Sequence, residues 1–127
     1  GAVMIVEDDA DVRETMAEVL ESEGFDVHTA REGHEALTLL ERGARPDVIL
    51  LDLMMPGMNG WQLRAELERR RELATIPIVI VSAMDPGPGQ PGQQPVAGFL
   101  RKPFNLTALL GAVERARSLA AAESERS

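Results

Sequence analysis

The segment 48–60 constrains the fold more than any other part of the chain. It reads VILLDLMMPGMNG, an apolar run that leads into Asp52 and then into a Met-Met-Pro-Gly turn. Continuous apolar runs are typical of strands buried on both faces, as in the parallel sheets of α/β proteins. Such sheets place their sites at the carboxyl ends of the strands. Because a lone buried carboxylate is costly, Asp52 is interpreted either as a local capping group or as part of a functional site.

Three further apolar runs also end in polar residues. They are AVMIV before Glu7, Asp8 and Asp9, IPIVIV before Ser82, and GFLR before Lys102. If these runs are neighbouring parallel strands, their carboxyl ends meet at one edge of one sheet. The sequence therefore predicts that acidic, hydroxyl and amine groups converge around Asp52.

Apolar residues between these runs recur at helical spacing. The pattern predicts a strand over 25–30 and helices over 11–23, 32–42, 59–73 and 105–121. Asp9 or Asp11 is expected to cap the first helix and Asn105 the last. Alternation of strands and helices is typical of a parallel sheet with helices on both faces. We expect one domain over 1–121, followed by a frayed polar tail over 122–127.

Composition excludes several classes of protein. A net charge of −8 in 127 residues argues against direct binding of nucleic acid by this domain. The absence of cysteine excludes disulfides and thiolate chemistry. Apolar runs fall well short of the roughly 20 residues of a membrane span, and no signal peptide is visible. We therefore expect a cytoplasmic protein without membrane contact.

One segment interrupts the alternation of strands and helices. Between Ser82 and Gly98 the chain holds four prolines and three glycines. In a helix interior, proline costs about 3 kcal/mol and glycine about 1 kcal/mol relative to alanine. The composition predicts an extended or mobile loop over 85–95 in place of a helix.

The motifs VEDDADVR, LLDLMMPGMNGWQL, IVIVSA and FLRKPF, in this order, resemble the receiver domains of bacterial two-component response regulators. The resemblance runs from Val3 to about Leu119 and is to the chemotaxis-regulator type. It implies a flavodoxin-like, doubly wound sheet of five parallel strands in the order 2-1-3-4-5. The Pro/Gly-rich segment stands where this family has its fourth helix, so the resemblance implies a missing or replaced helix and an altered output face.

The resemblance also implies roles for the residues at the strand ends. Asp52 is the implied phosphoacceptor, while Ser82 and Lys102 are implied to contact the bound phosphoryl group. Phe99 falls at the position of the family's switch aromatic, with simple core packing as the alternative interpretation. A cis peptide is implied before Pro103, where it would set the direction of the preceding lysine.

A divalent cation, Mg²⁺ or Mn²⁺, is the implied cofactor. Asp8 and Asp52 would bind it directly, Glu7 through water, and Met54 through its backbone carbonyl; such oxygen donors suit Mg²⁺. Asp9 is interpreted mainly as a helix cap, with a role as a ligand as the alternative.

Three functions are weighed. The first is a phosphorylation switch in which a sensor histidine kinase or a histidine phosphotransfer protein donates the phosphoryl group to Asp52. The second is an interaction module that acts without phosphorylation. The third, a Mg²⁺-dependent phosphohydrolase, ranks last because Met54 stands where a second acid would be needed. We expect a monomer or weak dimer, and the apolar Met54 and Met84 suggest a long-lived acyl phosphate.

Overall fold

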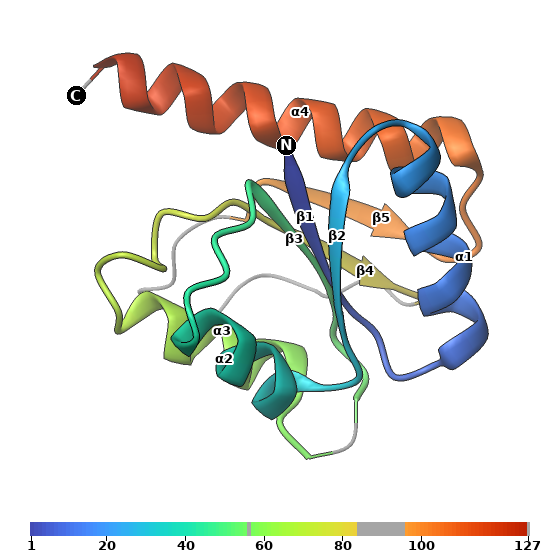
Figure 1. Ribbon diagram of the computed structural model, residues 1–127, viewed down its shortest axis with the longest axis horizontal. Helices are drawn as coiled ribbons and strands as arrows, with labels where there is room; N and C mark the ends of the chain where they lie inside the picture. Colours follow the sequence, from blue (N-terminus) through green and yellow to red (C-terminus); the bar gives the residue numbers. More distant parts are fainter. Residues whose placement is uncertain (56, 84–95, 127) are drawn as a thin grey trace.

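The computed structural model describes residues 1–55, 57–83 and 96–126, with side chains described as far as residue 120. Within these residues the chain forms a sheet covered by helices on both faces (Figure 1). The strands are β1 (Ala2–Val6), β2 (Asp26–Ala30), β3 (Val48–Asp52), β4 (Ile78–Ser82) and β5 (Gly98–Arg101). The helices are α1 (Ala10–Ser22), α2 (Gly33–Glu41), α3 (Gly60–Glu68) and α4 (Leu106–Arg126).

All strand pairs in the described sheet are parallel, in the order β2-β1-β3-β4-β5. This confirms the doubly wound fold and the strand order that the resemblance implies. Asp52 at the end of β3 lies opposite Val81, and Ser82 lies opposite Arg101. The strand ends are therefore level, and the residues that follow them share one edge of the sheet.

The two faces of the sheet have separate apolar cores, because alternate residues of each strand point to opposite faces. Met4 and Val6 of β1 belong to the core that α2 and α3 cover. Val3 and Ile5 belong to the core that α1 and α4 cover. Figure 1 shows this pairing of helices on either side of the sheet. Strands buried on both faces account for the nearly unbroken apolar runs in the sequence.

Side-chain caps fix where the helices begin. Asp9 caps α1, which decides between the two capping residues considered for this helix. Asn59 and Gln62 form a reciprocal capping box at the start of α3. Asn105 accepts a hydrogen bond at 2.8 Å from a backbone N–H in the first turn of α4, as predicted. The start of α3 matters for the site, because it directly follows the segment that leaves β3.

The helix predicted over 59–73 is shorter than expected. It ends at Glu68, and the chain continues in turns in which the Leu73 N–H donates to the Arg70 carbonyl at 3.0 Å. Leu73 still reaches the core, where only 3% of its surface is exposed. Leu73 therefore continues the apolar spacing of the helix, although the backbone at this point forms turns and no longer the hydrogen bonds of an α-helix.

The last helix is longer than expected. It continues to Arg126, past the predicted end at Ala121, through a segment rich in Ala, Glu and Arg. These residues are strong helix formers. The Pro/Gly-rich loop predicted over 85–95 lies outside the described residues. None of the helices described is both long enough and apolar enough to cross a membrane.

Candidate functional site

The carboxyl edge of the sheet gathers buried polar side chains. Glu7, Asp52 and Ser82 expose 2%, 4% and 2% of their surface, respectively. Among the described residues, Arg64 is the other buried polar or charged residue, and it lies in α3. The sequence prediction that polar groups converge at this edge is therefore confirmed for Glu7, Asp52, Ser82 and the partly buried Lys102.

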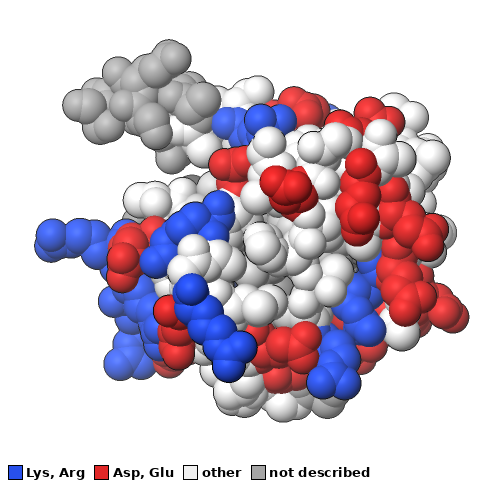
Figure 2. Space-filling model, in the orientation of Figure 1, with Lys and Arg blue, Asp and Glu red and all other residues white. Residues whose placement is uncertain are grey.

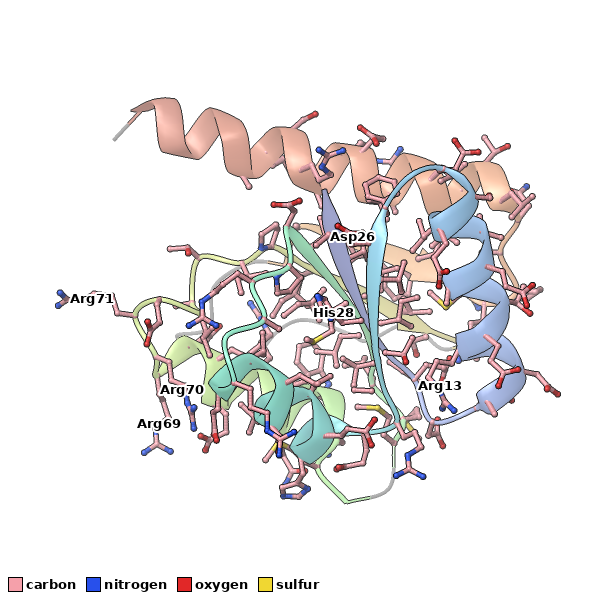
Figure 3. All side chains as sticks on the ribbon, in the orientation of Figure 1. Arg13, Asp26, His28, Arg69, Arg70 and Arg71 are labelled. Carbon is pink, nitrogen blue, oxygen red and sulfur yellow. The ribbon has the colours of Figure 1, made fainter. Side chains whose placement is uncertain are left out.

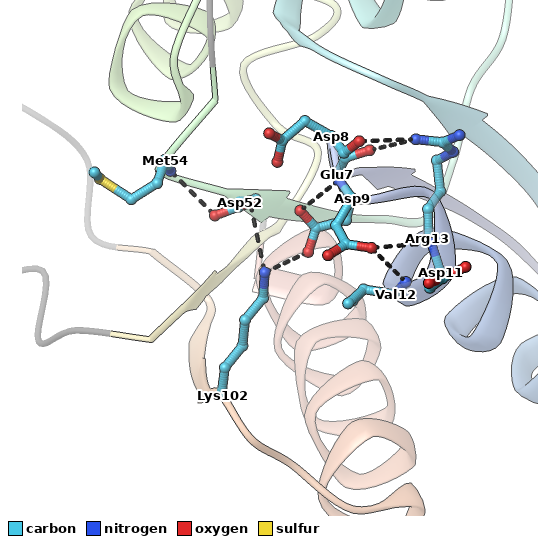
Figure 4. A network of polar contacts seen from close by, with 9 residues as sticks. All are labelled: Glu7, Asp8, Asp9, Asp11, Val12, Arg13, Asp52, Met54 and Lys102. Carbon is cyan, nitrogen blue, oxygen red and sulfur yellow. Dashed lines mark hydrogen bonds and ion pairs between the residues drawn. The ribbon is translucent and has the colours of Figure 1, made fainter.

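Lys102 connects the strand ends. Its ammonium donates to a carboxylate oxygen of Glu7 and lies 3.5 Å from Oδ2 of Asp52 (Figure 4). The other oxygen of Asp52 accepts the backbone N–H of Met54 at 3.0 Å. The backbone N–H of Lys102 donates to the Ser82 carbonyl at 2.9 Å. One cation thus faces two carboxylates that come from different strands.

Three carboxylates could hold a metal ion. Glu7, Asp8 and Asp52 each offer an oxygen, and these oxygens all lie within 4.8 Å of one another. Carboxylate oxygens are hard donors of the kind that Mg²⁺ and Mn²⁺ prefer. The donor set therefore fits the implied cofactor. The backbone carbonyl of Met54 stays a prediction as a further ligand.

Asp9 lies beside these carboxylates, with its backbone N–H 3.5 Å from Oε2 of Glu7, but its side chain caps α1. Its Oδ1 accepts the backbone N–H groups of Asp11 and Val12 at 3.0 and 3.2 Å. Both bonds satisfy donors at the first turn of α1, which otherwise lack partners. Capping, the preferred interpretation from sequence, is the role that these bonds assign to Asp9.

Burial and neighbouring charge control the ionisation of the site. Burial raises the pKa of Glu7 to about 8, and the nearby Asp52 adds to the rise although Lys102 opposes it. Burial alone would lower the pKa of Lys102, but its hydrogen bond with Glu7 and the charges of Glu7 and Asp52 raise it above its ordinary value. The dominant effect in this pair is the burial of the Glu7 carboxyl group, which favours its protonated form, whereas Lys102 is partly exposed.

Two further residues predicted at the site are exposed. Phe99 in β5 is 39% exposed, and Met54 after β3 is 70% exposed. The peptide bond between Lys102 and Pro103 is cis, as predicted. Phe99 is therefore not a core residue in this structure, which removes simple core packing as its explanation.

The start of α3 presses against the end of β3. A Cβ on Gly60 would lie 2.7 Å from the Asp52 carbonyl oxygen and 2.9 Å from the Leu53 Cα, closer than side chains approach backbone. Nearby, the Gly33 N–H of α2 donates to the Met58 carbonyl at 3.3 Å. Two helices thus hold the segment that follows Asp52.

Sequence reasoning missed Arg13. The guanidinium of this α1 residue donates to the backbone carbonyl of Glu7 at 2.9 Å and reaches that of Asp8 at 3.5 Å (Figure 4). The available signal was an arginine one helical turn after Asp9, in a segment otherwise dominated by acids.

Comparison with known proteins gives a consistent result. Residues 3–114 match the sequence model of a family described as the response regulator receiver domain. Protein PilG of Pseudomonas aeruginosa is 31% identical over 115 residues, which cover 88% of this chain and 84% of PilG. The DNA-binding response regulator MtrA of Mycobacterium tuberculosis is 43% identical over 81 residues, or 64% of this chain. That match covers 34% of MtrA, so the chain matches about a third of this relative's length.

Solved structures agree with these sequence matches. A CheY-like receiver domain protein from Methanospirillum hungatei has a TM-score of 0.83 and 33% identity, with 95% of this chain and 97% of that chain covered. A sensor protein from Polaromonas has a TM-score of 0.85 and 26% identity, with 94% and 97% covered.

Proposed function

We propose, from the premise that the chain belongs to the response regulator receiver domain family, that Asp52 accepts a phosphoryl group and thereby switches partner interactions. The donor is a phosphohistidine of a sensor histidine kinase or of a histidine phosphotransfer protein. The observation that carries the proposal is the setting of Asp52: a buried carboxylate at a strand end, 3.5 Å from the Lys102 ammonium and within 4.8 Å of acidic oxygens from Glu7 and Asp8.

The chemistry follows from this setting. An oxygen of the Asp52 carboxylate attacks phosphorus, the phosphorus–nitrogen bond of the donor breaks, and the electron pair leaves with the imidazole nitrogen. The product is an acyl phosphate. No general base is required, because a carboxylate at neutral pH is already a nucleophile. Bound Mg²⁺, held by Asp8, Asp52, Glu7 and the Met54 carbonyl, would supply charge neutralisation at the phosphoryl oxygens.

Lys102 and Ser82 serve the phosphoryl group once it is attached. The ammonium of Lys102 acts as a point charge beside Asp52. The Ser82 hydroxyl would donate to a phosphoryl oxygen; Ser82 is the last residue of β4, which pairs with β3. The exposed Met54 at the rim offers no group that could orient an attacking water. A long-lived acyl phosphate follows as part of the proposal.

The partners beyond the donor are also proposals. The matched MtrA regulator is described as DNA-binding, and this chain matches only a third of its length. We assign DNA contact to no part of this domain, whose net charge is −8. The domain acts as a switch: the phosphorylation state of Asp52 controls its interaction with a downstream effector protein or domain. The domain is a monomer or a weak dimer. The cytoplasmic location stays a prediction.

The experiment is intact-mass analysis after incubation with Mg²⁺ and a small acyl-phosphate donor. Wild type should gain one phosphoryl group, and Asp52→Asn should gain none. Asp26→Asn, at an exposed site in β2, is the matched control and should behave as wild type. EDTA should abolish the modification. A folded wild-type protein that stays unmodified would contradict the proposal and favour an interaction module that works without phosphorylation.

A further inference from the structure

Arg13 lies next to the acidic site without belonging to its ligand set. It sits in the first turns of α1, and its guanidinium points back at the loop that leaves β1 (Figure 4). The hydrogen bond to the Glu7 carbonyl is 2.9 Å long, and the contact to the Asp8 carbonyl is 3.5 Å. Its targets are backbone oxygens, so the arginine leaves the carboxylates of both residues available.

These two contacts fix the peptide that joins Glu7 to Asp8. A peptide unit is planar, so holding the Glu7 carbonyl sets the orientation of the whole unit. The two carboxylates branch from the Cα atoms at its ends. On the other side, the Glu7 N–H donates to the Ala30 carbonyl of β2 at 3.0 Å. The loop is thus held both by β2 and by α1.

The loop needs such a restraint because its charges repel one another. Four of the five residues in 7–11 are acidic. Asp8 is exposed while Glu7 is buried, so the repulsion favours turning Asp8 outward into water. Arg13 supplies a cation and a directional donor in the same segment. Charge-assisted hydrogen bonds of this kind are stronger than neutral ones.

We infer that Arg13 is a positioning residue that raises the affinity of the Glu7, Asp8 and Asp52 oxygens for a divalent cation by holding the Glu7–Asp8 peptide in place. The inference rests on the proposed function, because it concerns the same site. Groups that orient metal ligands from outside typically change metal affinity by about 10-fold to 100-fold when removed.

The direction in which cation affinity changes when Arg13 is removed distinguishes a positioning role from a purely electrostatic one. A positive charge near a cation site repels the cation, so removing Arg13 would tighten binding if charge alone mattered. Removing a positioning residue weakens binding instead. A purely structural role would lower thermal stability but leave the cation affinity of the folded protein unchanged.

The test is a Mn²⁺ titration in which electron paramagnetic resonance reports free Mn²⁺, with Mg²⁺ as competitor. The variants are Arg13→Gln and the charge-matched control Arg69→Gln. Arg69 is exposed at the end of α3, on the opposite side of the molecule from Arg13 (Figure 3). Figure 2 shows that basic side chains gather around that end of the molecule while acidic ones cover the α1 side.

Arg13→Gln should weaken Mn²⁺ and Mg²⁺ binding by about tenfold, whereas Arg69→Gln should stay within about twofold. With the acyl-phosphate donor, Arg13→Gln should raise the Mg²⁺ concentration for half-maximal phosphorylation more than it lowers the rate at saturating Mg²⁺. Arg13→Lys, which keeps the charge and one donor group, should show an intermediate loss and serves if Arg13→Gln does not fold.

Unchanged or tighter cation binding in both folded Arg13 variants would overturn the inference. If wild type binds Mn²⁺ and is phosphorylated, that result leaves the proposed function intact. If wild type itself binds no divalent cation, the metal step of the proposed function fails, and the inference fails with it.

Discussion

The ammonium of Lys102 donates a hydrogen bond to the carboxyl group of Glu7 and makes a longer contact, of 3.5 Å, to Asp52. In the proposed function, Lys102 must therefore leave its Glu7 partner to bind a phosphoryl group on Asp52. Glu7 therefore matters beyond the proposed cation site, because its charge state determines how firmly Lys102 is held before phosphorylation. The first two predictions test this charge state.

The protein should become less stable as pH rises from 5 to 8, because of Glu7. Its pKa in the folded protein is raised from 4.5 to about 8, so between these values the folded protein keeps a proton that the unfolded chain releases. The free energy of unfolding then decreases as pH rises, by up to about 1.4 kcal/mol per pH unit from this group. Urea unfolding in EDTA at pH 5 to 8 should show this decline in wild type and a flatter curve in Glu7→Gln. Parallel curves for the two proteins would contradict the prediction.

Binding of Mg²⁺ should release protons near neutral pH. A cation beside Glu7 favours its ionised form, and metal-free Glu7 with a pKa of about 8 carries a proton at pH 7. Adding Mg²⁺ to weakly buffered protein at pH 7 should therefore acidify the solution, as a pH electrode or an indicator dye would record. Glu7→Gln should release fewer protons while still binding the ion. Equal release from both proteins would assign the protons to another group.

Gly60→Ala should damage the site and the fold together. The added Cβ would lie 2.7 Å from the Asp52 carbonyl oxygen, and backbone cannot yield as a flexible side chain does. Overpacking of this kind typically costs about 1–3 kcal/mol. Urea unfolding should show this loss, and cation affinity should fall as well.

Gly111→Ala provides the control of opposite sign. The nearest atoms to a Cβ there belong to the Arg115 side chain, with its NH1 atom at 3.2 Å, and that side chain can move. Replacing glycine with alanine inside a helix stabilises it by up to about 1 kcal/mol. If both alanine variants destabilise the protein equally, the steric account of Gly60 is wrong.

Glu32 should contribute stability only while it is ionised. Its carboxylate caps α2, accepting the N–H groups of His34 and Glu35 at 2.9 Å each, and it also contacts the His34 ring. Burial acts to raise its pKa, but these hydrogen bonds and the His34 charge lower it overall. Because the folded pKa lies below the ordinary value, the stabilisation is present above about pH 4.5 and is lost as pH falls further.

The corresponding measurement compares wild type with Glu32→Ala. Loss of an N-cap costs about 1 kcal/mol at neutral pH, and the gap should narrow in acid as wild-type Glu32 takes up a proton. Glu35→Ala, which removes a half-buried carboxylate that pairs with the exposed Arg31, should show a smaller loss at pH 7. A gap that stays constant down to pH 3 would contradict the capping role.

The sequence predicts the strands better than the helix ends. The runs that became β1, β3 and β4 are recognisable because burial on both faces demands unbroken apolar residues. Their order across the sheet does not follow from periodicity and came from the family resemblance. The end of α3 was misplaced because Leu73 packs into the core from a turn, which apolar spacing cannot distinguish from a helix.

Some residues of the candidate site could likewise be predicted from the sequence, and others could not. The convergence of Asp52, Ser82 and Lys102 at one edge of the sheet was predictable, because polar residues at the ends of apolar runs are conspicuous. Arg13 was not, because it acts through backbone carbonyls, and an arginine on a helix ordinarily faces solvent. Glu32 was missed as a cap because its long side chain is an uncommon choice at that position.

The hydrogen bond from the Lys102 N–H to the Ser82 carbonyl joins the last residue of β4 to the residue that follows β5. The two side chains proposed to contact the phosphoryl group thus come from neighbouring strand ends that a backbone hydrogen bond joins. A small displacement of the serine toward a new oxygen on Asp52 would carry the end of β5, and with it the connection into α4. Phosphorylation of Asp52 could therefore move β5, the edge strand of the sheet, through the single backbone hydrogen bond between Lys102 and Ser82.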